Sequence, residues 1–120
     1  MATYTTYAVA VWDGDRPGDD VAARAMFDTL YSQYVNRPYG EAPAPPTPRI
    51  DVYRQILLAR YPQDAPDCPW STRLANEVTG PLMYFVIKIE QYVKVSYFVA
   101  KVAADQGLVC FDLQWGKLRP

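Results

Sequence analysis

The sequence predicts an α+β domain, and three observations lead to this class. Residues 5–12 and 82–89 are apolar runs rich in β-branched and aromatic residues, a composition typical of buried strands. Three other segments repeat their apolar side chains at helical spacing, namely 20–35, 48–61 and 91–105. Glycine, proline and aspartate separate these segments, as expected for turns. Strands and helices therefore alternate along one chain.

Length and composition indicate a single globular domain. The chain has 120 residues, half of them apolar, so we expect one domain over residues 1–120 with a proline-rich surface loop at 38–48. The formal net charge of −1 is not that of a nucleic-acid binder. No apolar run approaches the roughly 20 residues that cross a bilayer, and the N-terminus lacks signal-peptide features. We therefore expect a cytoplasmic protein without nucleic-acid or membrane partners.

The first half should form a central strand and two helices. Both faces of the strand 5–12 are apolar: Ala8, Ala10 and Trp12 share one face, and Tyr7, Val9 and Val11 share the other. Asp19 or Asp20 is a suitable N-cap for the first helix. Thr47 and Pro48 should start the second helix, whose stripe is Ile50, Tyr53, Leu57 and Tyr61. Trp70 follows a loop, and we expect it to anchor that loop on the core.

The second half should contain a hairpin, a helix and a last strand. Residues 71–79 form a weak edge strand that pairs with 82–89 across Gly80-Pro81. In the strand 82–89, one face should meet the helices (Met83, Phe85, Ile87 and Ile89), and the other should be open (Leu82, Tyr84, Val86 and Lys88). The helix that follows has the stripe Val95, Phe98, Val99 and Val102 and a left-handed cap at Gly107. Residues 108–111 form the last strand, and 112–120 are a tail.

The order β-α-α-β-β-α-β resembles the ferredoxin-like split βαβ arrangement with one extra helix. The resemblance implies a two-layer sandwich with the helices on one face of a mixed sheet. We expect the strands 5–12 and 82–89 to run parallel in the centre. Asp13 and Glu90 would then share one edge, and Asp112 would end its strand at the opposite edge.

The last third of the chain resembles small uncharacterised bacterial α/β proteins. In these proteins a strand containing Tyr-Phe precedes a helix and a second strand. The residues that carry the resemblance are Tyr84, Phe85, Gly107, Leu108, Val109, Phe111, Asp112 and Gln114. Some similar proteins accompany secreted toxins as immunity proteins, which implies a protein partner. The matching residues are strand and cap positions, so no catalytic residue is implied.

The residue types present disfavour most catalytic chemistry. The chain has no histidine and two cysteines, Cys68 and Cys110, so the usual general base and a structural zinc site are missing. We expect both cysteines to be thiols, with Cys110 buried. Glycines lack the spacing of phosphate-binding loops. Glu90 and Asp112 could act as an acid–base pair only if their carboxyl groups lay close together. The sequence therefore predicts no cofactor, no metal and no enzymatic activity.

Acidic and aromatic residues remain as candidates for a contact with a partner. The acidic residues after the first strand are either turn and cap residues or a docking patch for a basic partner. Tyrosine and tryptophan are either core residues or members of a contact face. The candidate partner-binding residues are Asp13, Asp15, Asp19, Asp20, Trp12, Tyr84, Lys88 and Trp115.

Two kinds of function fit these features. The first is a small protein-binding module, with an immunity protein that occludes a toxin as one form and a homodimer that pairs its open sheet faces as another. The alternative is a small enzyme or small-molecule binder, which would use carboxylates or tyrosines in a pocket between sheet and helices.

Overall fold

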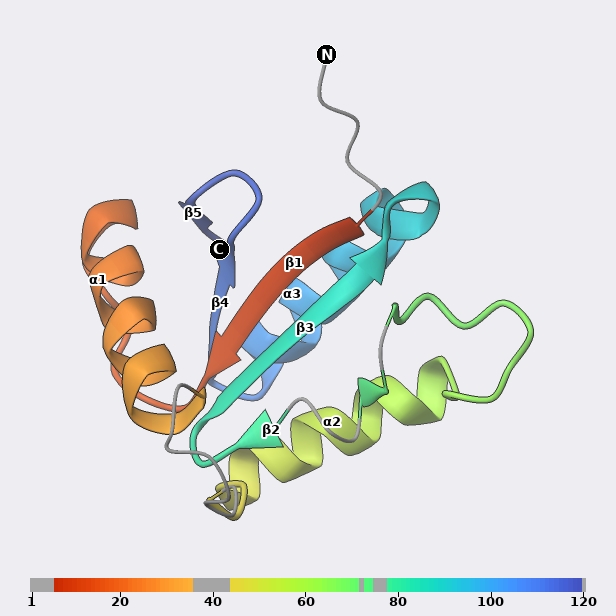
Figure 1. Cartoon of the computed structure of the whole chain (residues 1–120), viewed down its shortest axis with the longest axis horizontal. Coiled ribbons are helices and arrows are strands. Elements are labelled where there is room, and N and C mark those ends of the chain that lie inside the picture. Colours follow the sequence, from red (N-terminus) through yellow and green to blue (C-terminus); the bar gives the residue numbers. More distant parts are fainter. Residues whose placement is uncertain (1–5, 36–43, 72, 75–77, 120) are drawn as a thin grey trace.

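The computed structural model describes residues 6–35, 44–71, 73–74 and 78–119, which form an α+β domain around one sheet (Figure 1). Its five strands lie in the order β2-β3-β1-β4-β5. Their bounds are β1 (Thr6–Trp12), β2 (Val78–Thr79), β3 (Leu82–Lys88), β4 (Val109–Asp112) and β5 (Lys117–Leu118). The α-helices in these ranges are α1 (Asp20–Leu30), α2 (Pro48–Arg60) and α3 (Tyr92–Asp105). Most of the loop predicted at 38–48 lies outside the described residues.

All pairs of neighbouring strands are antiparallel, so the prediction of a mixed sheet is wrong. The turn at Gly80 reverses the chain between β2 and β3, and β3 pairs antiparallel with β1, from Thr6 opposite Lys88 to Trp12 opposite Leu82. Asp13 follows β1 and Glu90 follows β3, so these two residues lie at opposite ends of the sheet. Asp112 pairs with Val9 in a strand that runs in the same direction as β3. Asp112 and Glu90 therefore point to the same end, contrary to expectation.

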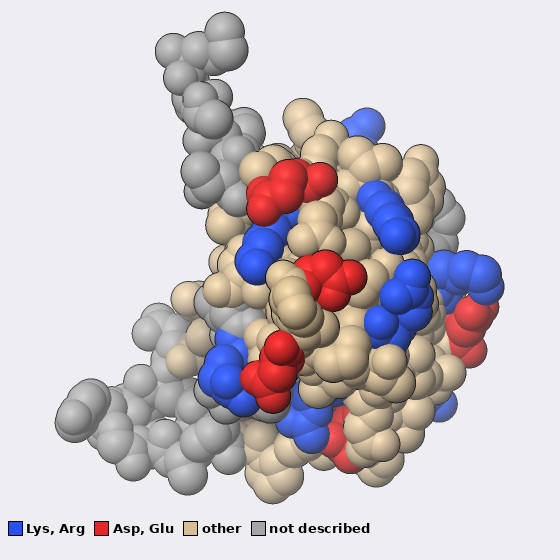
Figure 2. Space-filling model, turned by 90° about the vertical axis from the view of Figure 1, so that its right-hand side faces the viewer, with Lys and Arg blue, Asp and Glu red and all other residues tan. Residues whose placement is uncertain are grey.

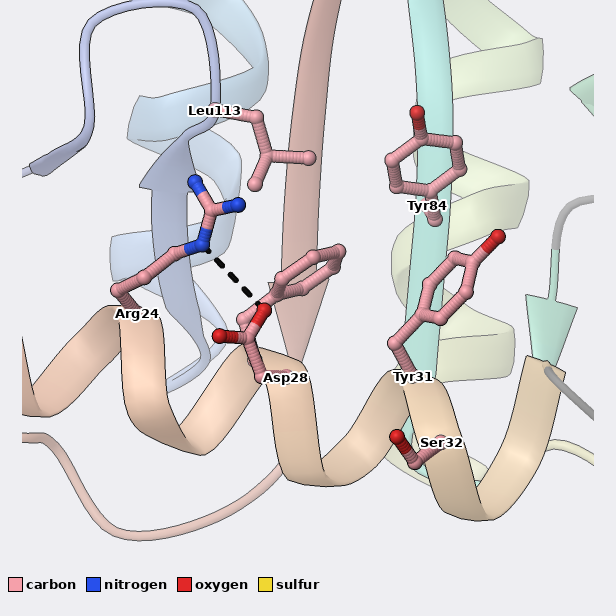
Figure 3. Close-up of a pocket in the computed structure, with 7 residues that line it drawn as sticks. Arg24, Asp28, Tyr31, Ser32, Tyr84 and Leu113 are labelled. Atoms are coloured by element: carbon pink, nitrogen blue, oxygen red, sulfur yellow. Dashed lines mark hydrogen bonds and ion pairs between the residues drawn. The ribbon is translucent and has the colours of Figure 1, made fainter.

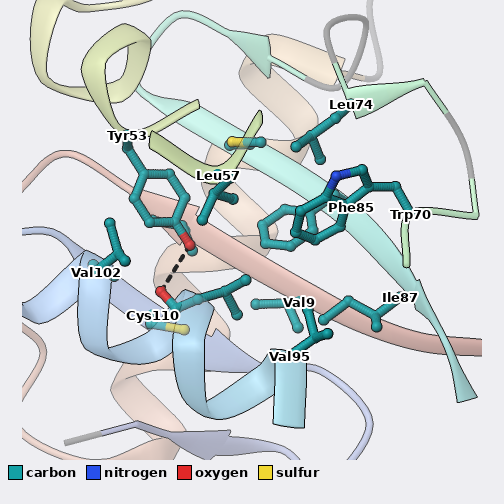
Figure 4. Close-up of a cluster of buried hydrophobic side chains, with 14 of the residues drawn as sticks. Val9, Tyr53, Leu57, Trp70, Leu74, Phe85, Ile87, Val95, Val102 and Cys110 are labelled. Carbon is teal, nitrogen blue, oxygen red and sulfur yellow. Dashed lines mark hydrogen bonds between the residues drawn. The ribbon is translucent and has the colours of Figure 1, made fainter. Parts of the chain in front are cut away.

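Helices α2 and α3 cover one face of the sheet, as the sequence predicts. The α2 stripe of Ile50, Tyr53 and Leu57 is fully buried, and β3 contributes the face of Met83, Phe85 and Ile87 (Figure 4). The Tyr53 hydroxyl donates to the Val99 carbonyl at 2.9 Å, which satisfies the polar end of a buried ring. Burial raises the pKa of Tyr53 well above its ordinary value. Tyr53 therefore acts as a neutral core residue.

Helix α1 lies on the other face, so the prediction that all helices share one face is wrong. Ala23 and Phe27 of α1 pack in a second core cluster with residues of the sheet, namely Ala10, Trp12, Leu82, Val109 and Phe111. Alternation along β1, β3 and β4 places these sheet residues on the face opposite α2 and α3. Both faces of β1 are apolar, so each face needs a covering layer. A helix that follows β1 directly supplies the second one.

Trp70 anchors its loop on the core, which confirms the prediction. The side chain is buried, its indole N–H donates to the Tyr61 carbonyl at 2.8 Å, and its ring meets Tyr61 and Phe85 edge-on. Its backbone forms an isolated bridge with Ile87. The segment therefore continues the sheet edge beside β3. Of the predicted strand 71–79, only Val78–Thr79 is a strand among the described residues.

The C-terminal segment is not a simple tail, because β5 pairs with β4. Gly107 has φ 72° and ends the turn after α3, as predicted, and Gly116 has φ 66° in the β4–β5 turn. The outer edge of β5 is occupied by polar side chains. Asp20 accepts from the Leu118 N–H at 2.8 Å, and Arg16 donates to the Arg119 carbonyl at 2.9 Å.

The surface charges are mixed in sign. Figure 2 shows lysine and arginine interspersed with aspartate and glutamate on the face that it presents. Within the described ranges, none of the helices is long and apolar enough to cross a membrane.

Candidate binding surface

Exposed aromatic and apolar side chains gather at one end of the sheet. Six large hydrophobic residues are exposed in the described part of the chain, and three of them, Val93, Tyr97 and Trp115, line one pocket. Their exposed fractions are 56%, 69% and 62%. Exposed apolar residues that cluster in this way mark interaction sites more often than isolated ones do.

This pocket, the hairpin pocket, lies between the N-terminal half of α3 and the β4–β5 hairpin and has a volume of about 450 Å³. It is lined by Tyr7, Tyr92, Val93, Ser96, Tyr97, Asp112, Trp115 and Arg119. Tyr7 and Tyr92 stack with ring centroids 5.0 Å apart. The α3 residues reach the pocket because positions 93 and 97 are four apart on one helical face.

Asp112 lies at the buried end of this pocket, with a side chain that is 5% exposed. It accepts hydrogen bonds from the Tyr7 hydroxyl and, at 3.0 Å, from the Trp115 backbone N–H. Desolvation by burial raises the pKa of Asp112, and the bonds from the backbone N–H groups of Trp115 and Gln114 oppose that shift, as does Arg119. Asp112 therefore shapes the β4–β5 turn, and burial disfavours the charged form of its side chain.

Arg119 is the cationic residue of the hairpin pocket. Its guanidinium lies 3.8 Å from Asp112 Oδ2 and 5.4 Å from the centre of the Tyr97 ring. The side chain is 20% exposed, so it contacts both the buried acid and the outer aromatic rings. Within the described residues its guanidinium makes no hydrogen bond at ordinary length.

A second hollow, the α1 groove, lies on the opposite face of the sheet and has a volume of about 500 Å³ (Figure 3). It is lined by Arg24, Phe27, Asp28, Tyr31, Ser32, Tyr84 and Leu113. Phe27, Tyr31 and Tyr84 form an aromatic group with centroids 5.7 to 6.1 Å apart. Arg24 pairs with Asp28 at 3.3 Å, and both are exposed. Polar and aromatic groups therefore meet here without a buried charge.

Three of the four acidic candidates have partners in the surrounding fold. Asp19 is the N-cap of α1, accepting from the Ala22 N–H at 2.8 Å. Asp13 accepts from the Thr47 hydroxyl at 3.1 Å and lies 3.8 Å from Arg49. Asp20 binds the edge of β5. Asp15 is exposed. These contacts favour the turn and cap interpretation over a docking patch.

The four remaining candidates are distributed over different sites. Trp12 is 1% exposed beneath α1, so it is a core residue and not a surface contact. Tyr84 lies in the α1 groove. Lys88 shares the Tyr84 face but pairs with Thr6 at the far end of β1, away from α1. Trp115 lies in the hairpin pocket. The open sheet face expected from the sequence is thus only half open.

Sequence reasoning missed most of the hairpin pocket. Val93 and Tyr97 lie on the polar side of α3, where their spacing of four residues was a usable signal. The sequence has no local signal for Arg119, because its place beside Asp112 depends on the pairing of Asp112 with Lys117.

The remaining reactive groups have structural positions. Cys68 and Cys110 are both free thiols and Cys110 is buried, as predicted, and Cys68 is buried as well. Burial raises the pKa of Cys110 to about 12, which keeps the thiol protonated and unreactive. Among the described residues, no three acidic, cysteine or histidine side chains lie close enough to hold a metal ion.

We expect pH titration to distinguish the wild type from Asp112→Asn. Because the folded state raises the pKa of Asp112, it holds this proton more tightly than the unfolded chain does. The free energy of unfolding of the wild type, relative to the variant, should therefore fall as pH rises above about 4. Urea denaturation at several pH values measures this difference. A wild type that gains stability over the variant with rising pH would show that Arg119 and the turn outweigh the burial.

Comparison with protein families, with curated proteins and with solved structures finds no match to this chain.

Proposed function

We propose that this chain is a protein-binding module and that the hairpin pocket with its rim of Val93, Tyr97 and Trp115 is the contact surface. The observation that carries the proposal is the exposure of these three side chains around one hollow. Tryptophan, tyrosine and arginine are the residues most enriched among the energetically dominant contacts of protein interfaces. Trp115, Tyr97 and Arg119 supply all three types within one pocket.

The form of binding that we propose is occlusion of a toxin by a cytoplasmic immunity protein. A protein that acts by occlusion needs a rigid contact surface and no catalytic groups. The buried positions of both cysteines and the structural partners of the acidic residues are consistent with a non-catalytic role. The strand order of the sheet supports a ferredoxin-like arrangement extended by β5, in which α1 is the additional helix.

A photo-crosslinking experiment tests the contact surface. Benzoylphenylalanine at position 115 should give a one-to-one crosslink when the protein is expressed with the product of the adjacent gene. The same amino acid at position 52 is the matched control, because Val52 is 45% exposed on α2 and does not line the hairpin pocket. Crosslinks of equal yield at both positions, or none at position 115, would contradict the proposal.

Alanine substitution should locate the binding energy in the same residues. We expect Trp115→Ala to weaken the complex by about 30-fold or more, the effect of losing a dominant contact of about 2 kcal/mol. Val52→Ala should leave the affinity within about twofold, since residues outside an interface contribute little. Calorimetric titration of the two variants gives both values, and similar affinities for both would remove Trp115 from the interface.

A small-molecule binder is the alternative, and the α1 groove is the observation that favours it. The groove offers the Tyr31 and Tyr84 rings beside the Arg24–Asp28 pair. If this alternative holds, fragments that bind in an NMR screen should shift the signals of Tyr31 and Tyr84 and leave the signals of Trp115 unchanged.

A homodimer through the half-open sheet face would instead appear as a doubled mass in light scattering.

A further inference from the structure

The guanidinium of Arg119 has hydrogen-bond donors that no described residue of the hairpin pocket takes up at ordinary length. A guanidinium has five N–H donors, and the side chain of Arg119 is four-fifths removed from solvent. The acid that it faces, Asp112, has its Oδ2 atom 3.8 Å away, which is beyond the length of a direct hydrogen bond. We infer that the hairpin pocket takes a carboxylate of the partner protein, bound by Arg119, with an adjacent apolar group against the aromatic walls. This inference rests on the proposed function of the pocket.

Asp112 does not need Arg119 to satisfy its oxygen atoms. One oxygen accepts from the Trp115 backbone N–H at 3.0 Å, and the other accepts from the Tyr7 hydroxyl. Among the described residues, Arg119 therefore has N–H donors without a hydrogen bond of ordinary length, so a ligand that brings an acceptor gains more there than one that brings a donor. An incoming carboxylate can take up Arg119 N–H groups while Asp112 keeps its own partners.

The planar geometry of the guanidinium favours a carboxylate as the acceptor. Two parallel N–H groups match the two oxygens of a carboxylate, and such paired bonds are stronger than bonds to neutral groups. A cationic ligand is disfavoured, because Arg119 lies nearer to solvent than Asp112, with side chains 20% and 5% exposed. A cation that enters the pocket therefore meets Arg119 before it reaches the acid.

The walls determine what accompanies the carboxylate. Tyr97 and Trp115 are exposed by more than half and flank the entrance, so each gains apolar burial when a partner group covers it. The volume of about 450 Å³ is at the lower end of ordinary ligand pockets. One aromatic or aliphatic side chain beside its carboxylate fits this space. A phenylalanine-sized group is therefore a suitable probe.

N-acetylphenylalanine and its neutral amide, N-acetylphenylalaninamide, form a matched pair that differs only in the carboxylate. In NMR titrations of the full chain we expect the acid to shift the Trp115 indole signal and the amide to bind at least about tenfold more weakly. Arg119→Gln should reduce the affinity for the acid by a similar factor and leave the amide unchanged. Arg119→Lys should recover only part of the loss, because it keeps the charge without the planar fork.

Equal affinity for the acid and the amide in the wild type would overturn the inference. This comparison uses the wild-type protein alone, so it does not depend on whether any variant folds. Tighter binding of phenethylammonium than of the acid would overturn it too, since that result would assign the pocket to a cation. Tyr97→Leu leaves the Arg119–Asp112 pair in place and should weaken the acid and the amide alike. A loss confined to the acid would show that Tyr97 does not contact the apolar group.

The two proposals can fail separately. Crosslinking at position 115 without a preference for the acid would keep the protein interface and remove the carboxylate site. A preference for the acid without any crosslink would mean that the pocket binds a free small acid, and the proposed partner would then be wrong.

Discussion

Trp70→Ala is expected to lower the free energy of unfolding by about 3–5 kcal/mol, the range measured for removing a large aromatic ring from a core. The ring is 3% exposed and packs edge-on against Tyr61 and Phe85. Its loss also leaves the Tyr61 carbonyl without the indole donor at 2.8 Å. Urea denaturation measures the change.

Trp115→Ala is the matched control for this prediction. The Trp115 side chain is 62% exposed, so the same substitution should change the free energy of unfolding by about 0.5 kcal/mol or less. Equal losses at both positions would contradict the anchoring role of Trp70.

A comparison of phenylalanine variants isolates the contribution of the indole hydrogen bond. Trp12 has a buried indole nitrogen without a partner in the described residues, so Trp12→Phe should cost about 1 kcal/mol less than Trp70→Phe.

Gly80→Ala is expected to lower the free energy of unfolding by about 2–5 kcal/mol, because backbone strain and a steric clash add together. Gly80 has φ 56°, a conformation that costs energy for any residue with a Cβ atom. A Cβ atom at this position would lie 2.7 Å from two atoms of the Tyr34 ring. Gly80 also bonds the segment before α2 through Ala44 and Thr47, so a shift of the turn would disturb the start of that helix.

Gly116→Ala separates the two causes. Gly116 has φ 66°, and a Cβ atom there meets no atom within 4 Å, so only the strain of about 1–2 kcal/mol should appear. The excess loss in Gly80→Ala then measures the clash. In the background of Tyr34→Ala, the cost of Gly80→Ala should fall to that of Gly116→Ala. If it does not, Tyr34 is not the obstacle.

The sequence predicts the layer formed by α2, α3 and the sheet. The spacing of apolar residues along a helix or strand indicates which side of that element is buried. Ile50, Tyr53 and Leu57 recur at helical spacing, and all three are fully buried. The position of α1 could not be predicted in this way. The stripe of Ala23 and Phe27 indicates that one side of α1 is buried, but it does not indicate on which face of the sheet the helix packs. The direction of β3 relative to β1 could not be predicted either, because the hairpin at Gly80 fixes β3 only relative to β2, and the pairing with β1 depends on tertiary structure.

The candidate site was harder to predict than the fold. A pocket needs residues that are distant in the chain, and here Tyr7 of β1 meets Asp112 and Arg119 of the C-terminal hairpin. Single exposed residues such as Trp115 could be chosen by type alone. Trp12 is a residue of the same type but is buried, because a tryptophan on a strand face can be covered by any neighbouring helix. Exposure depends on tertiary packing and is not encoded at one position.

The contacts of Asp20 and Arg16 with β5 have a consequence for self-association. An unpaired strand at a sheet margin presents N–H and carbonyl groups to which another chain can add. Here the Leu118 N–H is already occupied by Asp20, the first residue of α1, and the Arg119 carbonyl by Arg16 of the loop before that helix. At the other margin, β2 has only two residues. Recruitment of further copies into a growing β-structure would thus require these side chains to be displaced first, and the protein should resist fibril formation at high concentration.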